Sequence, residues 1–304
     1  MKKSGIVKWQ GGKTSLLDEI VPRFPKGFKT YVEVFGGAGA VILNKKIKTD
    51  VEIYNDYNSD LVNLFRVVKH RVFEFVRLLN VYNINSRVMF LSLRSLMNNT
   101  PVPYECIKKN MEISNEVLPS EEAVELATQY EKDNTDVELM NAINFFKRYS
   151  YSFGGGGDSF NCKPSTIVDV ADKMYRCSYA LKKVVIENKD FEEMIDKFKD
   201  DKYAFYYCDP PYYDTENYYE ADFKKSDHER LKNTLANIKG KFLLSYNDCP
   251  KIKELYKEYY ILEIERPNSM SNKKGSIYRE LLIANYDIIN INPHAFHKQM
   301  KLNF

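Results

Sequence analysis

Short apolar runs separated by polar or periodic stretches occupy both ends of the 304-residue chain. The runs are rich in β-branched and aromatic side chains, which is typical of buried strands. They lie at 30–34, 51–54, 184–187, 203–208, 241–245, 260–265 and 278–285. Helical periodicity between most of them predicts an α/β fold with a mainly parallel sheet. The loop between the last two runs is too short for a crossover helix, so these two should pair as an antiparallel hairpin.

The middle of the chain lacks these strand signals. A strongly periodic helix is expected from Asp60, because the apolar positions from Leu61 to Leu79 fall on one face. Other helices are expected in this region at 87–97, 120–132, 135–148 and 165–181, and around the sheet at 14–21, from 40, from 192, at 228–238 and at 250–258. We therefore expect residues 60–175 to form an inserted, mainly helical subdomain. Residues 1–59 and 176–304 should form the domain that contains the sheet.

Composition changes this picture little. A net charge of +3 with 44% hydrophobic and 29% charged residues is ordinary for a globular protein, and it permits a local nucleic-acid-binding patch without arguing for one. Five scattered cysteines without a C-x-x-C pair fit reduced cytosolic thiols better than disulfides or zinc. His294 and His297 have no third ligand nearby, so no metal is expected. Neither a signal peptide nor an apolar stretch of about 20 residues is found, so no membrane association is expected.

A glycine-rich turn follows the first apolar run. Phe35-Gly36-Gly37-Ala38-Gly39 allows a tight turn and close approach of a ligand to the backbone. Ile42 stands where a dinucleotide fingerprint has its third glycine, which favours a nucleoside ligand and disfavours a nucleotide-dependent dehydrogenase. Asp56 follows the second run at the spacing of a ribose-binding acid, although capping of the next helix is the alternative.

A second glycine turn, Gly11-Gly12-Lys13-Thr14, lies near the N-terminus. A P-loop needs a glycine where Val7 stands and a strand before it, so this interpretation fails on both counts. What remains is a helix start with Lys13 and Trp9 beside it, which can receive an anionic group.

The run 203–208 ends abruptly at Asp209-Pro210-Pro211-Tyr212. Neither proline can donate to a sheet ladder, so the strand stops there. The motif presents a carboxylate, a carbonyl and an aromatic ring at the carboxyl end of a strand, where ligands bind in open α/β sheets. A structural turn after a core strand is the alternative for this motif taken alone.

The inserted region contains alternating aromatic and basic residues from Phe146 to Phe153, followed by four glycines, Gly154–Gly157. Such a segment can follow a phosphate backbone and insert rings or amides among bases, whereas a surface loop with a basic flank is the alternative. The candidate nucleic-acid contacts are Lys8, Lys147, Arg148, Tyr149, Asn161, Lys163, Asn272 and Lys273.

Taken in order, these motifs resemble the Dam-type DNA adenine N6-methyltransferases, whose cofactor motifs precede the target-recognition region. The matching segments are Lys8-Trp9-x-Gly11-Gly12-Lys13, Val32-Glu33-x-Phe35-x-Gly37-x-Gly39, Asn55-Asp56-x-Asn58-x-Asp60-Leu61, Asp209-Pro210-Pro211-Tyr212 and Gly275 to Asn285. The inserted region departs from the family, because it lacks the recognition hairpin associated with GATC methylation. The resemblance therefore implies a reaction and leaves the target sequence open.

The resemblance implies a Rossmann-like sheet of seven strands, S-adenosyl-L-methionine as cofactor and double-stranded DNA as substrate. The adenosine would lie over the Gly37–Gly39 turn with its ribose on Asp56, and Lys13 would pair with the methionine carboxylate. Asp190 and Phe191 would touch the adenine. The implied cofactor-binding residues are Trp9, Lys13, Phe35, Gly37, Gly39, Asp56, Asp190, Phe191 and Asp209.

The same resemblance implies methyl transfer to a flipped-out adenine. Asp209 and the Pro210 carbonyl would each accept one N6 hydrogen, which aims the nitrogen lone pair at the methyl group, and Tyr212 would stack on the base. Cytosine C5 chemistry is rejected, because Cys249-Pro250 has the wrong order for its nucleophile.

Several alternatives stay open. They are the same fold acting on cytosine N4 or RNA adenine, and a non-catalytic nucleic-acid-binding module. A cytoplasmic protein of a prokaryote or phage is expected. Oligomeric state is not predicted, a monomer being compatible, and a restriction partner is left open.

Overall fold

The computed structural model describes residues 4–81, 87–98, 136–161, 167–214, 223–267 and 277–291. The chain divides into two compact units, one within 1–6, 11–62 and 180–304, the other within 7–10 and 63–179. The sequence-based division, with residues 60–175 as the inserted subdomain, stays a prediction, and it did not anticipate residues 7–10 in the second unit. The role of the second unit in target recognition stays a prediction.

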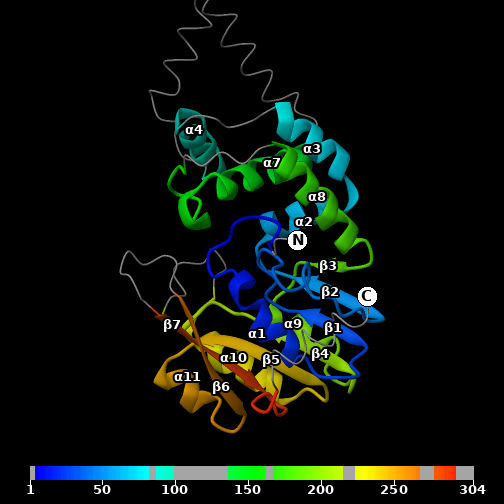
Figure 1. The fold of residues 1–304 in the computed structure, drawn as a ribbon, viewed down its shortest axis with the longest axis vertical. Helices are drawn as coiled ribbons and strands as arrows, with labels where there is room; N and C mark the ends of the chain where they lie inside the picture. The colour runs from blue at the N-terminus through cyan, green and yellow to red at the C-terminus, as the bar shows by residue number, and fades with distance from the viewer. Residues whose placement is uncertain are drawn as a thin grey trace, which may run out of the picture. The chain divides into compact units, whose positions relative to one another are not determined.

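The first unit is built on one seven-stranded sheet in the order β3-β2-β1-β4-β5-β7-β6 (Figure 1). The strands are β1 (Thr30–Glu33), β2 (Val51–Asn55), β3 (Val185–Glu187), β4 (Ala204–Cys208), β5 (Lys241–Asn247), β6 (Tyr260–Pro267) and β7 (Ile277–Ala284). Strands β1 to β5 pair in parallel, and β7 is antiparallel to both β5 and β6. The predicted mixed sheet and its terminal hairpin are thus confirmed.

Strand β4 is buried along its whole length, because both faces of the sheet are covered. Tyr206 and Cys208 face a core that includes Leu231. Phe205 packs on the opposite face against Phe24, with ring centroids 4.7 Å apart. Alternate residues therefore enter different cores, which explains why the strand is a continuous apolar run in the sequence.

Short helices surround the sheet: η1 (Lys13–Leu16), α1 (Leu17–Ile20), η2 (Val21–Arg23), α9 (Phe191–Asp196), α10 (Lys225–Ala236) and α11 (Pro250–Leu255). The single helix expected at 14–21 is three short turns. The helix expected from Ala40 was wrong, since residues 40–44 form turns. The Asn44 amide donates to the carbonyls of Ala40 and Ser4, which ends the helical turn there. Helix α10 starts before the expected His228, because the Asp227 carboxylate accepts the Lys224 backbone N–H.

The second unit is helical where it is described (Figure 1). Its helices are α3 (Val72–Val81), α4 (Arg87–Met97), α7 (Val137–Ser150), η3 (Phe153–Gly155) and α8 (Ile167–Leu181), and α2 (Ser59–His70) begins in the first unit. The single periodic helix expected from Asp60 is two helices that meet at Arg71, whose side chain pairs with Asp136 at the start of α7, 2.5 Å away. The helix expected at 120–132 lies outside the described residues.

Candidate active site

Asp209 lies immediately after β4, where the two prolines end the strand. Its Oδ1 is 2.7 Å from Lys13 Nζ and accepts a 2.8 Å hydrogen bond from the Ser245 hydroxyl of β5. Burial raises the pKa of Asp209, and the charge and hydrogen bond of Lys13 oppose that rise. The motif therefore presents a carboxylate that depends on its neighbours to stay ionised.

Lys13 connects the N-terminal glycine turn to this motif. Gly11 has a φ of 76°, which turns the chain so that Lys13 Nζ donates back to the Gly11 carbonyl at 2.8 Å. The same ammonium group lies 4.7 Å from the centroid of the Tyr212 ring. Although Lys13 is only 3% exposed, it contacts a carboxylate, a carbonyl and a ring. Two motifs almost 200 residues apart in the chain thus meet at one cation.

The Tyr212 hydroxyl donates to Glu280 Oε2 at 2.9 Å, and both side chains are buried. Glu280 comes from β7, where it is followed by a buried apolar run, 281–284. Sequence reasoning did not place Glu280 or Ser245 in the site. An acid directly before the apolar run 281–284 was the available signal for Glu280, and a serine inside β5 gave none.

The glycine turn after β1 is fixed by side chains of β2. The Asp56 carboxylate accepts the Gly37 N–H at 2.8 Å, and the Tyr54 hydroxyl donates to the Gly37 carbonyl at 2.7 Å. Gly37 and Gly39 have φ values of 50° and 70°, a conformation that glycine adopts without strain. The conformation of the turn is therefore determined by the neighbouring strand.

Asp56 also accepts the Asn58 backbone N–H at 2.8 Å, while the Asn58 side chain accepts the Leu61 N–H and caps α2. Burial raises the pKa of Asp56, and its backbone hydrogen bonds oppose that rise. Capping of the next helix is thus performed by Asn58. Asp56 joins the two strand ends, and the predicted ribose contact stays a prediction.

Aromatic rings and a further carboxylate follow the ends of β1 and β3. The rings of Phe35 and Phe191 have centroids 5.5 Å apart. Asp190 precedes Phe191 and accepts the Glu192 N–H at 3.0 Å, which begins α9. Phe35, Asp56, Asp190 and Asp209 thus follow four adjacent parallel strands, β1, β2, β3 and β4, at one edge of the sheet. This edge is where ligands bind in open α/β sheets.

The remaining predicted residues belong to the second unit or lie outside the described residues. The Trp9 ring packs against Tyr149 and Phe145, with centroids 4.8 Å and 5.9 Å away, and Lys8 Nζ donates to the Ser150 carbonyl. The residues outside the description are Lys163, Asn272, Lys273, His294 and His297.

The glycine segment of the second unit is held by residues predicted to contact nucleic acid. Lys147, Arg148 and Tyr149 are buried, and Arg148 Nε donates to the Gly157 carbonyl at 3.3 Å. The Asn161 backbone N–H donates to the Tyr151 carbonyl at 2.7 Å. Phe153, which was not among the predicted contacts, is 70% exposed.

Neither a metal-binding cluster nor a membrane-spanning helix is found within the described ranges. No group of three or more His, Cys, Asp or Glu side chains there is arranged to hold a metal ion. None of the helices described has both the length and the apolar character needed to cross a bilayer.

A Rossmann-like sheet whose central strand β4 runs into an Asp-Pro-Pro-Tyr motif, with carboxylates after the neighbouring strands, is the arrangement of the methyltransferase class of α/β enzymes. Residues 9–270 match the profile of the family described as D12 class N6 adenine-specific DNA methyltransferase. The chain belongs to this family. It is an enzyme that methylates adenine N6 in DNA, as the sequence predicted.

Named relatives agree with this assignment. The chain is 26% identical over 293 residues to the Type II methyltransferase M1.LlaDCHI of Lactococcus lactis subsp. cremoris, covering 92% of this chain and 95% of that protein. It is 25% identical over 288 residues to the Type II methyltransferase M.CviBI of Paramecium bursaria Chlorella virus NC1A, covering 92% and 99%. A shorter match is to the DNA adenine methylase of Serratia marcescens. It is 42% identical over 108 residues and covers 34% of this chain and 39% of that protein.

Proposed function

We propose that the methyl donor is S-adenosyl-L-methionine and that the residues after β1, β2 and β3 hold it. The observation that supports this is the set of groups at the sheet edge. Asp56 and Asp190 supply carboxylate acceptors, which suit ribose hydroxyls and an adenine amine, and Phe35 and Phe191 supply flat apolar surface. When bound, the donor supplies an electrophilic methyl group.

Lys13 completes the proposed cofactor site at the methionine end, while the predicted cofactor contact of Trp9, a residue of the second unit, stays a prediction. A cation that already touches the Asp209 carboxylate at 2.7 Å has the chemistry to pair with a second carboxylate. The Gly37–Gly39 turn, fixed by Asp56 and Tyr54, lets a ligand approach the backbone closely.

Asp209 and Pro210 are proposed to hold the target amine. Within the part of the chain that the structure describes, the contacts from Lys13 and Ser245 both fall on Asp209 Oδ1. We therefore expect Asp209 Oδ2 to accept one N6 hydrogen and the Pro210 carbonyl to accept the other. Accepting both hydrogens draws the nitrogen toward tetrahedral geometry and frees its lone pair for attack, so positioning and electrostatics carry the reaction.

Tyr212 is proposed to stack on the adenine, which must leave the duplex to reach the site. Its ring is fixed at two points, since Glu280 accepts a hydrogen bond from its hydroxyl and Lys13 lies against its face. A ring held in this way loses little rotamer freedom when the base arrives.

Double-stranded DNA is the proposed substrate form, with the second unit reading the target. The proposed DNA contacts are Lys8, Asn161 and Lys163 of this unit, together with Asn272 and Lys273 of the first unit. Because Lys147, Arg148 and Tyr149 are buried, we propose that they act by holding the glycine segment in place. A monomer in the cytoplasm of a prokaryotic or phage-infected cell belongs to the same proposal.

Transfer of a labelled methyl group from S-adenosyl-L-methionine to adenine-containing duplex DNA tests the proposal. We expect incorporation by the wild type and a loss of at least about 100-fold in Asp209→Ala, because a directed acceptor at the reacting group is removed. Asp200→Ala is the matched control, since Asp200 is an exposed carboxylate of the same unit, paired with Lys239. No incorporation by the wild type, or equal incorporation by Asp209→Ala, would overturn the assignment.

A further inference from the structure

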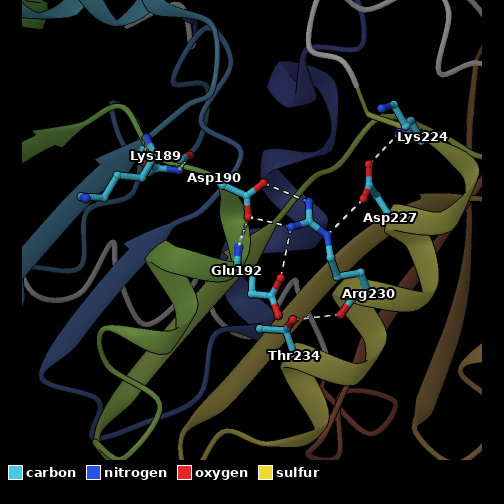
Figure 2. Close-up of polar contacts among 8 residues, drawn as sticks. Lys189, Asp190, Glu192, Lys224, Asp227, Arg230 and Thr234 are labelled. Atoms are coloured by element: carbon cyan, nitrogen blue, oxygen red, sulfur yellow. Dashed lines mark hydrogen bonds and ion pairs between the residues drawn. The ribbon is translucent and has the colours of Figure 1, made fainter.

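One arginine on α10 gathers three carboxylates around its guanidinium group (Figure 2). Arg230 Nη2 and Nη1 lie 2.9 Å and 3.0 Å from the two oxygens of Asp190, in a two-pronged contact. Nη1 also contacts Glu192 at 3.1 Å, and Nε contacts Asp227 at 3.0 Å. Asp190 and Glu192 come from the start of α9, so the arginine joins two helices that are separate in the sequence.

The same guanidinium covers the ring next to Asp190. Arg230 Cζ lies 4.1 Å from the centroid of the Phe191 ring, which is a close cation–π contact. Phe191 is also bordered by Phe35 and Phe223, with centroids 5.5 Å and 5.8 Å away. Both members of the Asp190–Phe191 pair are therefore held by one side chain.

This arrangement exceeds what the start of a short helix needs. Asp190 already accepts the Glu192 N–H through Oδ1, so α9 has its cap without the arginine. A partly exposed ion pair adds little stability by itself, and Arg230 and Asp190 are both more than a third exposed. What a two-pronged arginine contact does supply is orientation, since it fixes the plane of the carboxylate. Lysine could not do this.

We propose that Arg230 is a positioning residue for the adenine of the methyl donor. By holding the plane of Asp190, it aims Oδ2 so that this oxygen accepts a hydrogen from the exocyclic amine of the cofactor adenine. By stacking on Phe191, it holds that ring for contact with the adenine. The inference rests on the proposed cofactor site, and it adds a residue that touches the ligand only through two others.

The test compares two ligands in direct binding by calorimetry. They are S-adenosylhomocysteine and its inosyl analogue, which carries a carbonyl oxygen in place of the amine. The wild type should prefer the adenosyl ligand by about tenfold or more, because a carboxylate accepts from an amine and repels a carbonyl. Arg230→Met should bind the adenosyl ligand about tenfold more weakly and the inosyl ligand nearly as before, so that the preference falls toward one.

Two further variants make the result specific. Lys232→Met is the matched control, because Lys232 lies on the same helix and forms an ion pair with Glu258. It should keep the wild-type preference. Arg230→Lys keeps the charge without the two-pronged contact, so it should lose most of the preference while unfolding at a temperature close to that of the wild type. It carries the test if Arg230→Met does not fold.

The outcomes separate the two proposals. A wild type that binds neither ligand nor S-adenosyl-L-methionine would overturn the cofactor assignment. A wild type that binds both ligands equally would overturn the role of Asp190 in recognising the amine. If the wild type discriminates and folded Arg230 variants discriminate equally well, the positioning role of Arg230 is wrong and the cofactor site stands.

Discussion

Lys13 carries a single positive charge that serves three neighbours at once. It contacts the Asp209 carboxylate, the Gly11 carbonyl and the Tyr212 ring while almost wholly buried. Burial raises the pKa of Asp209, and the charge of Lys13 opposes that rise and so favours the ionised, accepting form. In the proposed site, Lys13 would therefore serve both the methyl donor and the carboxylate that holds the target amine.

Replacing Lys13 by methionine tests this dependence. The pKa of Asp209 should rise further, because the largest influence opposing burial is removed. The acidic limb of kcat/KM for DNA should move to higher pH by about one unit or more. The measurement is a profile from pH 5 to pH 9. Lys253→Met, which removes a partly exposed cation paired with Asp248 and Glu263, should leave the limb in place, and an unmoved limb in Lys13→Met would refute the argument.

Tyr212 and Glu280 form a buried pair whose coupling can be measured. Tyr212→Phe removes a hydroxyl donor from a buried carboxylate, which should lower the free energy of unfolding by about 1–3 kcal/mol. In the Glu280→Gln background, Tyr212→Phe should lower the free energy of unfolding by less. A buried neutral amide is destabilised less than a carboxylate when its hydrogen-bond donor is removed. Urea unfolding of the four proteins gives the coupling energy, and strict additivity would show that the pair is not coupled.

Glu33 makes stability depend on pH. Burial raises its pKa from 4.5 to about 8, although the Tyr31 hydroxyl donates to it at 2.8 Å. The folded chain therefore binds this proton more tightly than the unfolded chain. The resulting stabilisation is complete below pH 4.5 and is lost as pH rises through about 8.

Glu33→Gln should remove this contribution to the pH dependence of the free energy of unfolding. Relative to the variant, the wild type should lose on the order of 3–5 kcal/mol of unfolding free energy between pH 4.5 and pH 9. Denaturant unfolding at five pH values measures the difference. Parallel curves for the two proteins would mean that Glu33 is ionised in the fold.

Strands and their ends were the most predictable elements. Val32, Ile53 and Tyr206 lie in runs that are apolar because the sheet is covered on both faces, so composition alone marks them. Motif residues directly after a strand, such as Asp56 and Asp209, are then placed by the rule that carboxyl ends of parallel strands share an edge. The sequence-based prediction of the fold was correct for this reason, whereas the reaction was predicted from the resemblance of the ordered motifs to a known family.

Partners that arrive from distant elements were not predictable. Ser245 reaches Asp209 only because β5 pairs with β4, and Glu280 reaches Tyr212 because β7 pairs with β5. Arg230 reaches Asp190 across the packing of α10 on α9. No local pattern encodes such pairings. The helix expected after Gly39 does not form. The Asn44 side chain donates to the Ala40 carbonyl and so competes with the backbone for that acceptor.

The glycine segment of the second unit offers a test of DNA engagement. Phe153 is 70% exposed beside Gly154 and Gly155, whose φ values are 64° and 78°. If this ring contacts bases, Phe153→Ala should raise KM for duplex DNA about tenfold, since stacking on a base contributes about 1–3 kcal/mol. Affinity for the methyl donor should not change.

The control for this experiment is Phe73→Ala. Phe73 is 75% exposed in the same unit and lies on α3, away from the glycine segment in the chain. It should leave KM for DNA unchanged. Equal effects of the two substitutions would count against a specific role for Phe153.

At the scale of the whole molecule, the chain passes between its two units four times. It crosses after residues 6, 10, 62 and 179, and the second crossing comes directly before the Gly11–Lys13 turn. The first unit contains Lys13, Asp56 and Asp190, which are proposed to hold the methyl donor. The second unit contains Trp9 together with the proposed nucleic-acid-binding segment of α7 and the glycines.

The placement of residues 7–10 has a consequence for how new sequence specificities are made, in evolution or in the laboratory. A chimaera that exchanges only residues 63–179 with a relative separates Trp9 from Tyr149 and Phe145, the rings against which it packs. The transplanted module would then arrive without a ring that packs against it. The transferable cassette is therefore discontinuous: residues 7–10 have to travel with residues 63–179.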